Sequence, residues 1–333
     1  MDNSLEEKNQ FDGNLVYGLK NFNKKTGRDV HLERINREAN YIDRTTGRLK
    51  DEITYSRPCP VCSSLEARTI FVKDGFPHVK CSLCSMVYVN PVLRDEHSDT
   101  FYFNEESWNK ILLNSTQVEL DRKKFEYGLK CIEKFMPGKG TLLDVGCGPG
   151  IFLEEACKRG WSVQGLEFNK FCITRLRENN FKIIDLPIEE IPLQDNSIQC
   201  ITLWDVLEHI HKPYDMLSKI FSLLEPDGIL LVSVANVNAL VNRILHQDAS
   251  AFAGHAHVNF FSPETLNTFV NKIGFEILNF ETILTELGTI NNYLNYDDPY
   301  FGEAKPVFGF LTPEFIHENL LGKIILLVVR ARK

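Results

Sequence analysis

The amino-acid sequence predicts an α/β protein whose parallel sheet is covered by helices on both faces, with a small metal-binding module before it. From residue 141 onward, short apolar runs rich in β-branched residues alternate with stretches that can form helices. This alternation is typical of parallel sheets that are buried on both faces. The first of these runs leads directly into a glycine-rich turn, and upstream of it four cysteines form two C-x2-C pairs.

Composition narrows the class of protein. The chain has 333 residues, of which 43% are hydrophobic, and this length suits about two domains. Its longest aliphatic run, Ile324 to Val329, has six residues, whereas a membrane span needs roughly 20. The start, MDNSLEEKNQFDG, lacks the basic and apolar regions of a secretory signal. We therefore expect a cytoplasmic protein without membrane insertion.

Net charge and cysteine content also favour a cytoplasmic protein that does not act on nucleic acid. The formal net charge is −8 and the pI is near 5.7, which is the wrong sign for steering onto phosphate backbones and makes nucleic acid an unfavoured partner. The nine cysteines are odd in number and do not form a disulfide-like pattern, so they are interpreted as reduced thiols and metal ligands.

Three segments are predicted along the chain. Residues 1–56 form a polar extension, residues 57–104 a zinc-ribbon-like module, and residues 105–333 the main α/β domain. We expect the module and the main domain to have separate hydrophobic cores.

The elements of the main domain follow in order. Helical spacing over residues 108–135 predicts one or two helices, which Pro137-Gly138 ends. Five apolar runs predict strands, and a helix-forming stretch follows each of the first four: 142–145, 162–166, 182–184, 198–203 and 229–234. Two late strands are predicted at 275–280 and 323–330, joined by a longer insert over 287–321.

The glycine-rich turn is the first functional signal. Gly146, Gly148 and Gly150 follow the strand at 142–145 directly and precede a helix. Glycines let the backbone turn sharply beside a ligand, and the helix start offers free N–H groups. Glu167 ends the second strand, where a carboxylate can accept both hydroxyls of a ribose. A dinucleotide site, another nucleoside site and a plain structural turn are all compatible with the turn alone.

At these residues the sequence resembles the S-adenosylmethionine-dependent methyltransferases of the Rossmann-like class, whose first motif is an acidic residue followed by G-x-G-x-G. Further matching segments follow in the same order: Ile188–Pro192, Trp204–Ile210, Leu224–Gly228 and His257–Ser262. The resemblance implies a seven-stranded sheet with an antiparallel last strand and S-adenosylmethionine as the cofactor. It implies these donor-binding residues: Asp144, Gly146, Cys147, Gly148, Gly150, Glu167, Phe168, Ile188, Trp204 and Asp205. Pro187 stands where such enzymes often place an Asp that reads adenine.

The cysteine pairs predict a structural zinc site. Cys59-Pro-Val-Cys62 and Cys81-Ser-Leu-Cys84 are separated by 18 residues, and two such knuckles supply four thiolates in a closed tetrahedron. A redox dithiol is the alternative. The pattern resembles the amino-terminal zinc module of a bacterial methyltransferase group that includes sugar C-methyltransferases.

His257 is the candidate general base. His255-Ala256-His257 resembles the His-Glu-His segment of the sugar C-methyltransferases, in which a Glu-His pair is the base, but here Ala256 replaces the Glu. O-, N- and C-methylation therefore all stay open, and activity is expected to fall below about pH 6.5, the unperturbed histidine value. His209 and Tyr102 are further candidates, with orienting a loop and capping the pocket as their respective roles.

The resemblance and the composition favour methylation of a small molecule, namely a sugar nucleotide, a glycan precursor or a natural-product intermediate. An RNA methyltransferase that uses the zinc module for docking is the alternative from another substrate class, and a nonenzymatic cofactor-binding scaffold is the third. Whether the chain forms a homodimer stays open.

Overall fold

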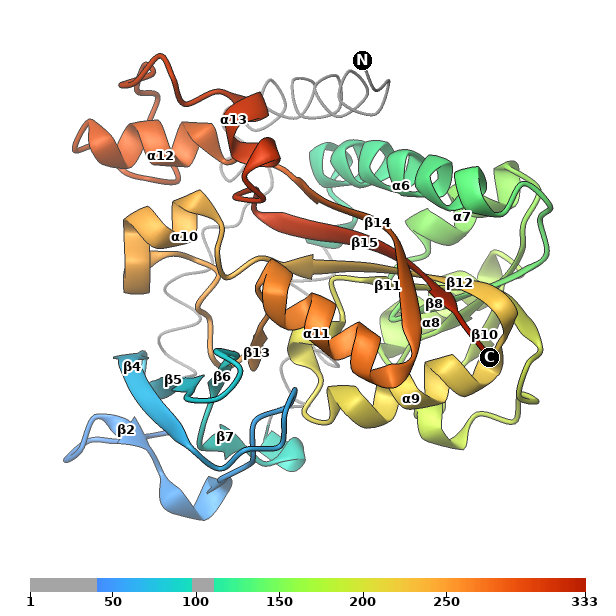
Figure 1. Cartoon of the computed structure of the whole chain (residues 1–333), viewed down its shortest axis with the longest axis horizontal. Coiled ribbons are helices and arrows are strands. Elements are labelled where there is room, and N and C mark those ends of the chain that lie inside the picture. Colours follow the sequence, from blue (N-terminus) through green and yellow to red (C-terminus); the bar gives the residue numbers. More distant parts are fainter. Residues whose placement is uncertain (1–40, 98–110) are drawn as a thin grey trace.

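A seven-stranded sheet organises the main domain of the computed structural model, which describes residues 41–97 and 111–333 (Figure 1). Its spatial order is β10-β9-β8-β11-β12-β15-β14. In chain order the strands are β8 (Thr141–Val145), β9 (Ser162–Leu166), β10 (Lys182–Ile184), β11 (Ile198–Trp204), β12 (Leu224–Ala235), β14 (Phe275–Ile283) and β15 (Ile324–Ala331). β15 is antiparallel to both of its neighbours, β12 and β14. The predicted sheet and its antiparallel last strand are confirmed.

Helices cover both faces of this sheet. They are α6 (Ser115–Phe135), α7 (Ile151–Lys158), α8 (Lys170–Glu178), α9 (Pro213–Leu223) and α11 (Pro263–Ile273). Figure 1 shows α6 and α7 on one side of the sheet and α9 and α11 on the other. Side chains alternate along β8 accordingly. Leu142 packs in the core cluster with α6 and α7, whereas Leu143 packs in the cluster with α9 and α11.

The expected helix after β10 is reduced to one short turn. The 3-10 helix η2 spans only Ile188–Glu190, between Pro187 and Pro192. A proline lacks the N–H that a longer helix would use, and it disfavours helical backbone in the residue before it.

The cysteine-containing module forms a four-stranded antiparallel sheet. Three strands are local, β4 (Ala67–Lys73), β5 (Phe76–Cys81) and β6 (Val87–Val89). The fourth, β13 (Asn259–Phe260), comes from the main domain and pairs with β6. Part of the predicted polar extension belongs to this region, because β1 (Ile42–Asp43) pairs with β2 (Arg48–Leu49) and β3 (Thr54–Tyr55) pairs with β7 (Val92–Leu93) after the 3-10 helix η1 (Asp51–Ile53).

The expectation of two separate cores is wrong. Cys59, Cys81 and Tyr88 of the module belong to the same buried cluster as Leu143 of β8 and Leu266 of α11. The cross-domain strand pair draws the module onto the α9 and α11 face, where its apolar side chains complete the main core.

The insert between β14 and β15 is partly helical. It contains α12 (Leu287–Leu294) and α13 (Pro313–Glu318), and α12 contacts α10 (Leu240–Leu245). Two further 3-10 helices, η3 (Leu207–His209) and η4 (His246–Asp248), lie in the loops after β11 and α10. Among the residues described, no helix is long and apolar enough to span a bilayer.

Candidate functional site

A cavity of about 2630 Å³ opens at the carboxyl ends of β8, β9 and β11. In open α/β sheets, ligands bind in the crevice outside these strand ends. Small-molecule sites usually measure roughly 300 to 1,000 Å³. The space therefore suffices for two ligands side by side.

The glycine-rich turn forms one wall of this cavity. Gly146, Gly148 and Gly150 all have left-handed backbone, with φ values of 74°, 51° and 88°. A Cβ on Gly146 would lie 2.7 Å from Cγ2 of Val206, and one on Gly150 would collide with Leu176. A Cβ on Gly148 would meet no atom within 4 Å. Packing thus requires glycine at the two outer positions, while Gly148 faces open space.

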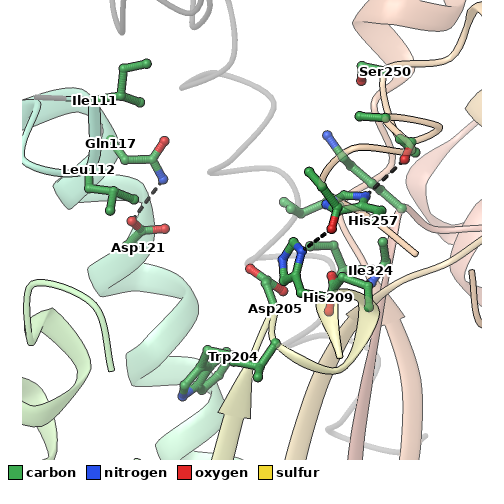
Figure 2. Close-up of a pocket in the computed structure, with 18 of the residues that line it drawn as sticks. Ile111, Leu112, Gln117, Asp121, Trp204, Asp205, His209, Ser250, His257 and Ile324 are labelled. Carbon is green, nitrogen blue, oxygen red and sulfur yellow. Dashed lines mark hydrogen bonds between the residues drawn. The ribbon is translucent and has the colours of Figure 1, made fainter. Parts of the chain in front are cut away.

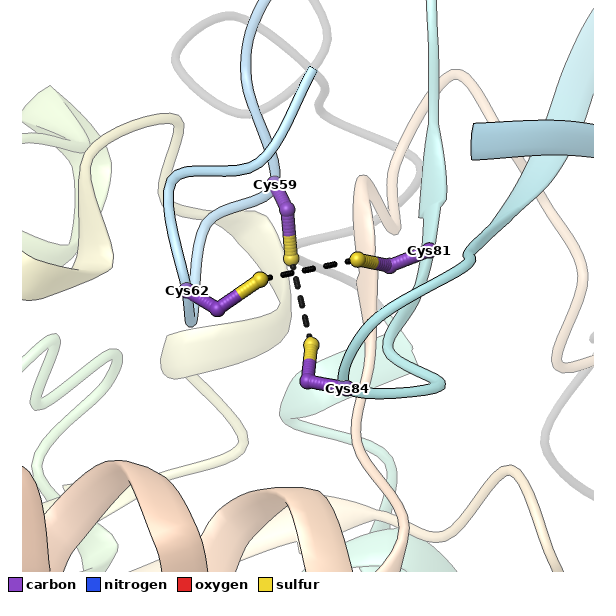
Figure 3. Close-up of side chains that lie close together, drawn as sticks. All are labelled: Cys59, Cys62, Cys81 and Cys84. Carbon is purple, nitrogen blue, oxygen red and sulfur yellow. Dashed lines mark hydrogen bonds between the residues drawn. The ribbon is translucent and has the colours of Figure 1, made fainter. Parts of the chain in front are cut away.

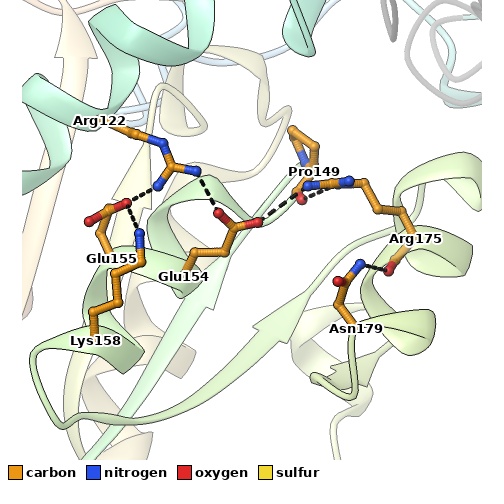
Figure 4. A network of polar contacts seen from close by, with 7 residues as sticks. All are labelled: Arg122, Pro149, Glu154, Glu155, Lys158, Arg175 and Asn179. Carbon is orange, nitrogen blue, oxygen red and sulfur yellow. Dashed lines mark hydrogen bonds and ion pairs between the residues drawn. The ribbon is translucent and has the colours of Figure 1, made fainter. Parts of the chain in front are cut away.

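Charged side chains of three helices hold the glycine-rich turn in place through hydrogen bonds and ion pairs (Figure 4). Arg175 of α8 donates from Nε to the carbonyl of Pro149 at 3.1 Å and from Nη2 to Glu154 at 3.2 Å. Arg122 of α6 pairs with Glu154 at 2.7 Å and also with Glu155. These contacts tie α6, α7 and α8 together around the turn.

Glu167 directly follows β9, and its side chain reaches the glycine-rich turn. Its Oε2 accepts the backbone N–H of Gly148 at 2.7 Å, and its Oε1 accepts those of Phe168 and Asn169 at 2.7 and 2.8 Å. Each carboxylate oxygen has two lone pairs. The side chain is therefore held rigidly, and Oε2 keeps capacity for a hydroxyl donor.

The structure brings together nearly all of the residues predicted to bind the donor. Nine of the ten line the cavity, and only Gly150 lies behind its wall: Asp144, Gly146, Cys147, Gly148, Glu167, Phe168, Ile188, Trp204 and Asp205. Their roles in binding stay predictions. Pro187 and Asp185 also line the cavity, and Asp185 pairs with Arg177 at 3.0 Å.

Asp144 and Cys147 are buried members of this set. Asp144 is buried and accepts the Thr202 hydroxyl at 2.7 Å, and burial raises the pKa of its carboxyl to about 8. It is thus largely protonated at neutral pH and lies in β8, just before the glycine-rich turn. Burial also raises the pKa of the Cys147 thiol, which leaves it a neutral packing group.

Lys124 is a site residue that the sequence reasoning missed. This buried side chain of α6 pairs with Asp205 at 2.7 Å, and the Ser233 hydroxyl donates to the other oxygen of Asp205 at 2.6 Å. Burial alone would raise the pKa of Asp205, but the ion pair with Lys124 lowers it. The available signal was a lysine at helical spacing from the apolar residues Leu120 and Tyr127.

Three side chains after β11 and before β13 form a second wall. His209 and His257 lie with ring centroids 4.9 Å apart (Figure 2). Nδ1 of His209 is 2.8 Å from the Ala256 carbonyl oxygen, and Nδ1 of His257 is 3.0 Å from that of Ala251. Glu208 lies beside them, 2% exposed, and accepts the Ala235 N–H at 3.3 Å.

The ionisation of these three groups is strongly perturbed. Burial, with His209 nearby, lowers the pKa of His257 to about 3. Burial also lowers the pKa of His209, and burial together with Asp205 raises that of Glu208 to about 8. All three are mainly uncharged at neutral pH. Tyr102, the other catalytic candidate, lies outside the described residues.

The four paired cysteines converge (Figure 3). Sγ of Cys59 is 3.4 Å from that of Cys84, and Sγ of Cys62 is 3.5 Å from that of Cys81. All four sulfurs lie within 4.8 Å of one another. With a Zn–S distance of about 2.3 Å, a tetrahedral site has S···S edges of roughly 3.8 Å. The donor set and its dimensions therefore fit a Cys₄ zinc ion.

The match to known proteins agrees with the fold and the cavity. Residues 119–279 match the family model described as a methyltransferase domain. Together with the sheet order and the cavity at the strand ends, this match supports the activity of an S-adenosylmethionine-dependent methyltransferase.

Individual relatives are distant. The chain is 26% identical over 211 residues to a ubiquinone biosynthesis O-methyltransferase of Psychrobacter arcticus, covering 51% of this chain and 77% of that protein. It is 30% identical over 126 residues to the protein of the same name from Psychrobacter cryohalolentis, covering 33% of this chain and 46% of that protein. A solved SAM-dependent methyltransferase from Archaeoglobus fulgidus aligns with a TM-score of 0.47 at 20% identity, covering 64% of this chain and 94% of that one.

Proposed function

We propose that the chain transfers a methyl group from S-adenosylmethionine to a hydroxyl oxygen of a small-molecule acceptor, such as a sugar nucleotide, a glycan precursor or a natural-product intermediate. The observation that carries the proposal is one continuous cavity with two unlike walls. The glycine-rich turn and Glu167 form one wall, and the wall that contains His209 and His257 is the other. A donor on the first wall faces an acceptor held by the second.

The cavity wall formed by the glycine-rich turn and Glu167 suits a nucleoside that carries an extended side chain. Glu167 offers an anchored carboxylate to ribose hydroxyls, and Gly148 leaves the turn open to a ligand. Ile188 is buried on the neighbouring segment, where an apolar side chain can pack against a base. Close alignment of sulfonium, methyl and acceptor then supplies much of the rate.

The second wall favours oxygen over carbon as the methylated atom. Abstracting a proton from carbon requires an effective base, whereas His257, with its pKa lowered to about 3, is a weak one. Ala256 also removes the carboxylate that the sugar C-methyltransferases place there. The two Psychrobacter relatives are named as O-methyltransferases, which supports the same choice.

A structural zinc ion held by Cys59, Cys62, Cys81 and Cys84 completes the proposal. Four thiolates leave no coordination position for a substrate. The two knuckles also have matching turns, because Ser63 and Ser85 directly follow the second cysteine of each pair and have φ values of 63° and 64°. The ion would close the module that supports β13.

The experiment is a screen of acceptors with methyl-labelled S-adenosylmethionine and the purified full chain. We expect one product whose mass rises by a single methyl group on oxygen, formed in step with S-adenosylhomocysteine. The Gly148→Val variant, with a branched side chain in the donor path, should lose the activity. Labelling of RNA alone, or of a carbon atom in the acceptor, would contradict the proposal.

A further inference from the structure

Glu208, His209 and His257 form a second group of metal-ligand side chains, separate from the cysteines. One ligand atom from each lies within 4.8 Å of the other two. The residues come from η3, directly after β11, and from the loop before β13, and all three line the cavity. Two imidazoles and one carboxylate are a ligand set that divalent transition cations use in proteins.

The backbone places a hydrogen on Nδ1 of both imidazoles, and it fixes His257 in the tautomer that a metal requires. A carbonyl oxygen can only accept a hydrogen bond, so the contacts with Ala256 and Ala251 place a hydrogen on Nδ1 of His209 and of His257. In the neutral ring of His257, Nε2 then carries the lone pair, while His209 also has a hydrogen bond to the Asp205 backbone. Metal-binding histidines usually donate their other ring N–H in this way, which orients the ring and raises its basicity as a ligand.

Glu208 supplies an unsatisfied acceptor at the same place. Its Oε2 is buried and has no hydrogen-bond partner among the described residues, while Oε1 accepts the Ala235 N–H at 3.3 Å. Buried polar atoms are normally paired, since leaving one unpaired costs free energy. A cation bound here would satisfy this oxygen and stabilise the ionised carboxylate.

The nearby carboxylate of Asp205 is already engaged. Lys124 binds one of its oxygens at 2.7 Å and Ser233 the other at 2.6 Å. This ion pair keeps Asp205 away from the role of a fourth protein ligand. A cation held by the remaining three residues would retain open positions.

We propose that Glu208, His209 and His257 bind one divalent transition cation, such as Mn²⁺, Fe²⁺ or Zn²⁺, whose open positions face the acceptor part of the cavity. The site is independent of the Cys₄ cluster, whose thiolates suit zinc and bind Mn²⁺ poorly.

The use of the cation in methyl transfer rests on the proposed function. A coordinated hydroxyl loses its proton more readily because the cation stabilises the oxygen anion. The C–O bond then forms as the S–CH₃ bond breaks, and sulfur keeps the electron pair. The products are a methyl ether, S-adenosylhomocysteine and one proton released to water.

The test measures Mn²⁺ binding to the full chain by electron paramagnetic resonance, with the Cys₄ cluster loaded with zinc and no acceptor present. We expect one Mn²⁺ per chain, with spin-echo couplings from two imidazole nitrogens. Glu208→Gln and His257→Ala should each weaken binding by about tenfold or more. The matched controls Glu178→Gln and His246→Ala change exposed residues outside the cluster and should bind Mn²⁺ as the unmodified chain does.

Several outcomes would overturn the proposal. They are the absence of Mn²⁺ binding to the unmodified chain, binding without imidazole couplings, and equal binding by the two cluster variants. Calorimetry with S-adenosylhomocysteine checks that each variant is folded, and the nitrogen couplings of the unmodified chain decide the question if a variant is not. Because the readout needs no methyl transfer, a failed acceptor screen would leave it unaffected.

Discussion

Replacing Glu167 with alanine is expected to weaken S-adenosylmethionine binding by about 10- to 150-fold. A hydrogen bond to a charged group contributes roughly 1.5 to 3 kcal/mol, and each 1.4 kcal/mol corresponds to about a factor of ten in affinity. The carboxylate is held in advance by three backbone N–H groups at 2.7 to 2.8 Å. Little rotamer entropy is then lost on binding, which places the effect in the upper part of that range.

The assay is isothermal titration calorimetry with S-adenosylhomocysteine, which avoids turnover. Glu167→Gln separates charge from shape, because its amide keeps one acceptor oxygen but presents an NH₂ group to the backbone donors. We expect its affinity to lie between those of the alanine variant and the unmodified chain. Glu178→Ala, an exposed glutamate at the end of α8, is the control and should leave affinity unchanged. Unchanged affinity in Glu167→Ala, with the fold intact, would remove Glu167 from the donor site.

Four further outcomes are expected. Chelating the proposed zinc ion should make the cysteine-containing module and the main domain unfold in one thermal transition, because they share a core cluster. Two separate transitions in circular dichroism would refute this. Burial lowers the pKa of His78 to about 4. As pH falls from 6.5 to 4, the unfolded chain therefore binds a proton at this residue before the folded chain does, and the free energy of unfolding decreases by about 3 kcal/mol. Urea titrations should show a smaller decrease in His78→Phe. His257→Ala should lower turnover by about tenfold or more at nearly unchanged donor affinity, because it removes one proposed ligand of the cation and no donor-site residue. Initial rates of the unmodified chain should show no loss from His257 protonation between pH 7 and 5, since its pKa is about 3. Arg57→Met should raise the acceptor KM or lower kcat while donor affinity stays constant. The substitution removes the hydrogen bonds to the carbonyls of His211 and Val258, at 3.0 and 2.6 Å, which lie on both sides of the wall that contains His209 and His257. The exposed control Arg68→Met should change neither constant.

Local sequence patterns were sufficient to predict the strands of the main sheet and the glycine-rich turn. The predicted strand at 162–166 is β9, and the run at 142–145 is β8 with one residue added. Each run contains buried apolar residues and is bounded by turn residues, so the local preference for a strand agrees with the packing around it. Glu167 was identified because a strand end fixes its place relative to the turn.

Other features depend on contacts that no local pattern contains. Lys124 reaches Asp205 only because α6 lies over the end of β11. The expected loss of activity below about pH 6.5 is replaced by a pKa near 3 for His257. Burial lowers this pKa, and so does the ring of His209, which the fold brings to a centroid distance of 4.9 Å. Strand β13 has two residues, too few for periodicity to reveal.

That short strand connects the cysteine-containing module to the wall of the cavity that contains His209 and His257. β6 begins three residues after Cys84, and Asn259 of β13 is paired with Tyr88 in the middle of β6. His257 lies two residues before Asn259, and Arg57, just before the first knuckle, donates to Asn259 Oδ1 at 3.0 Å. Loosening the knuckles would therefore move β6, then β13, and with it the ring of His257. A closed zinc site without a coordination position for substrate can thus control the geometry of the acceptor wall, because the backbone that it folds is the backbone on which that wall is built.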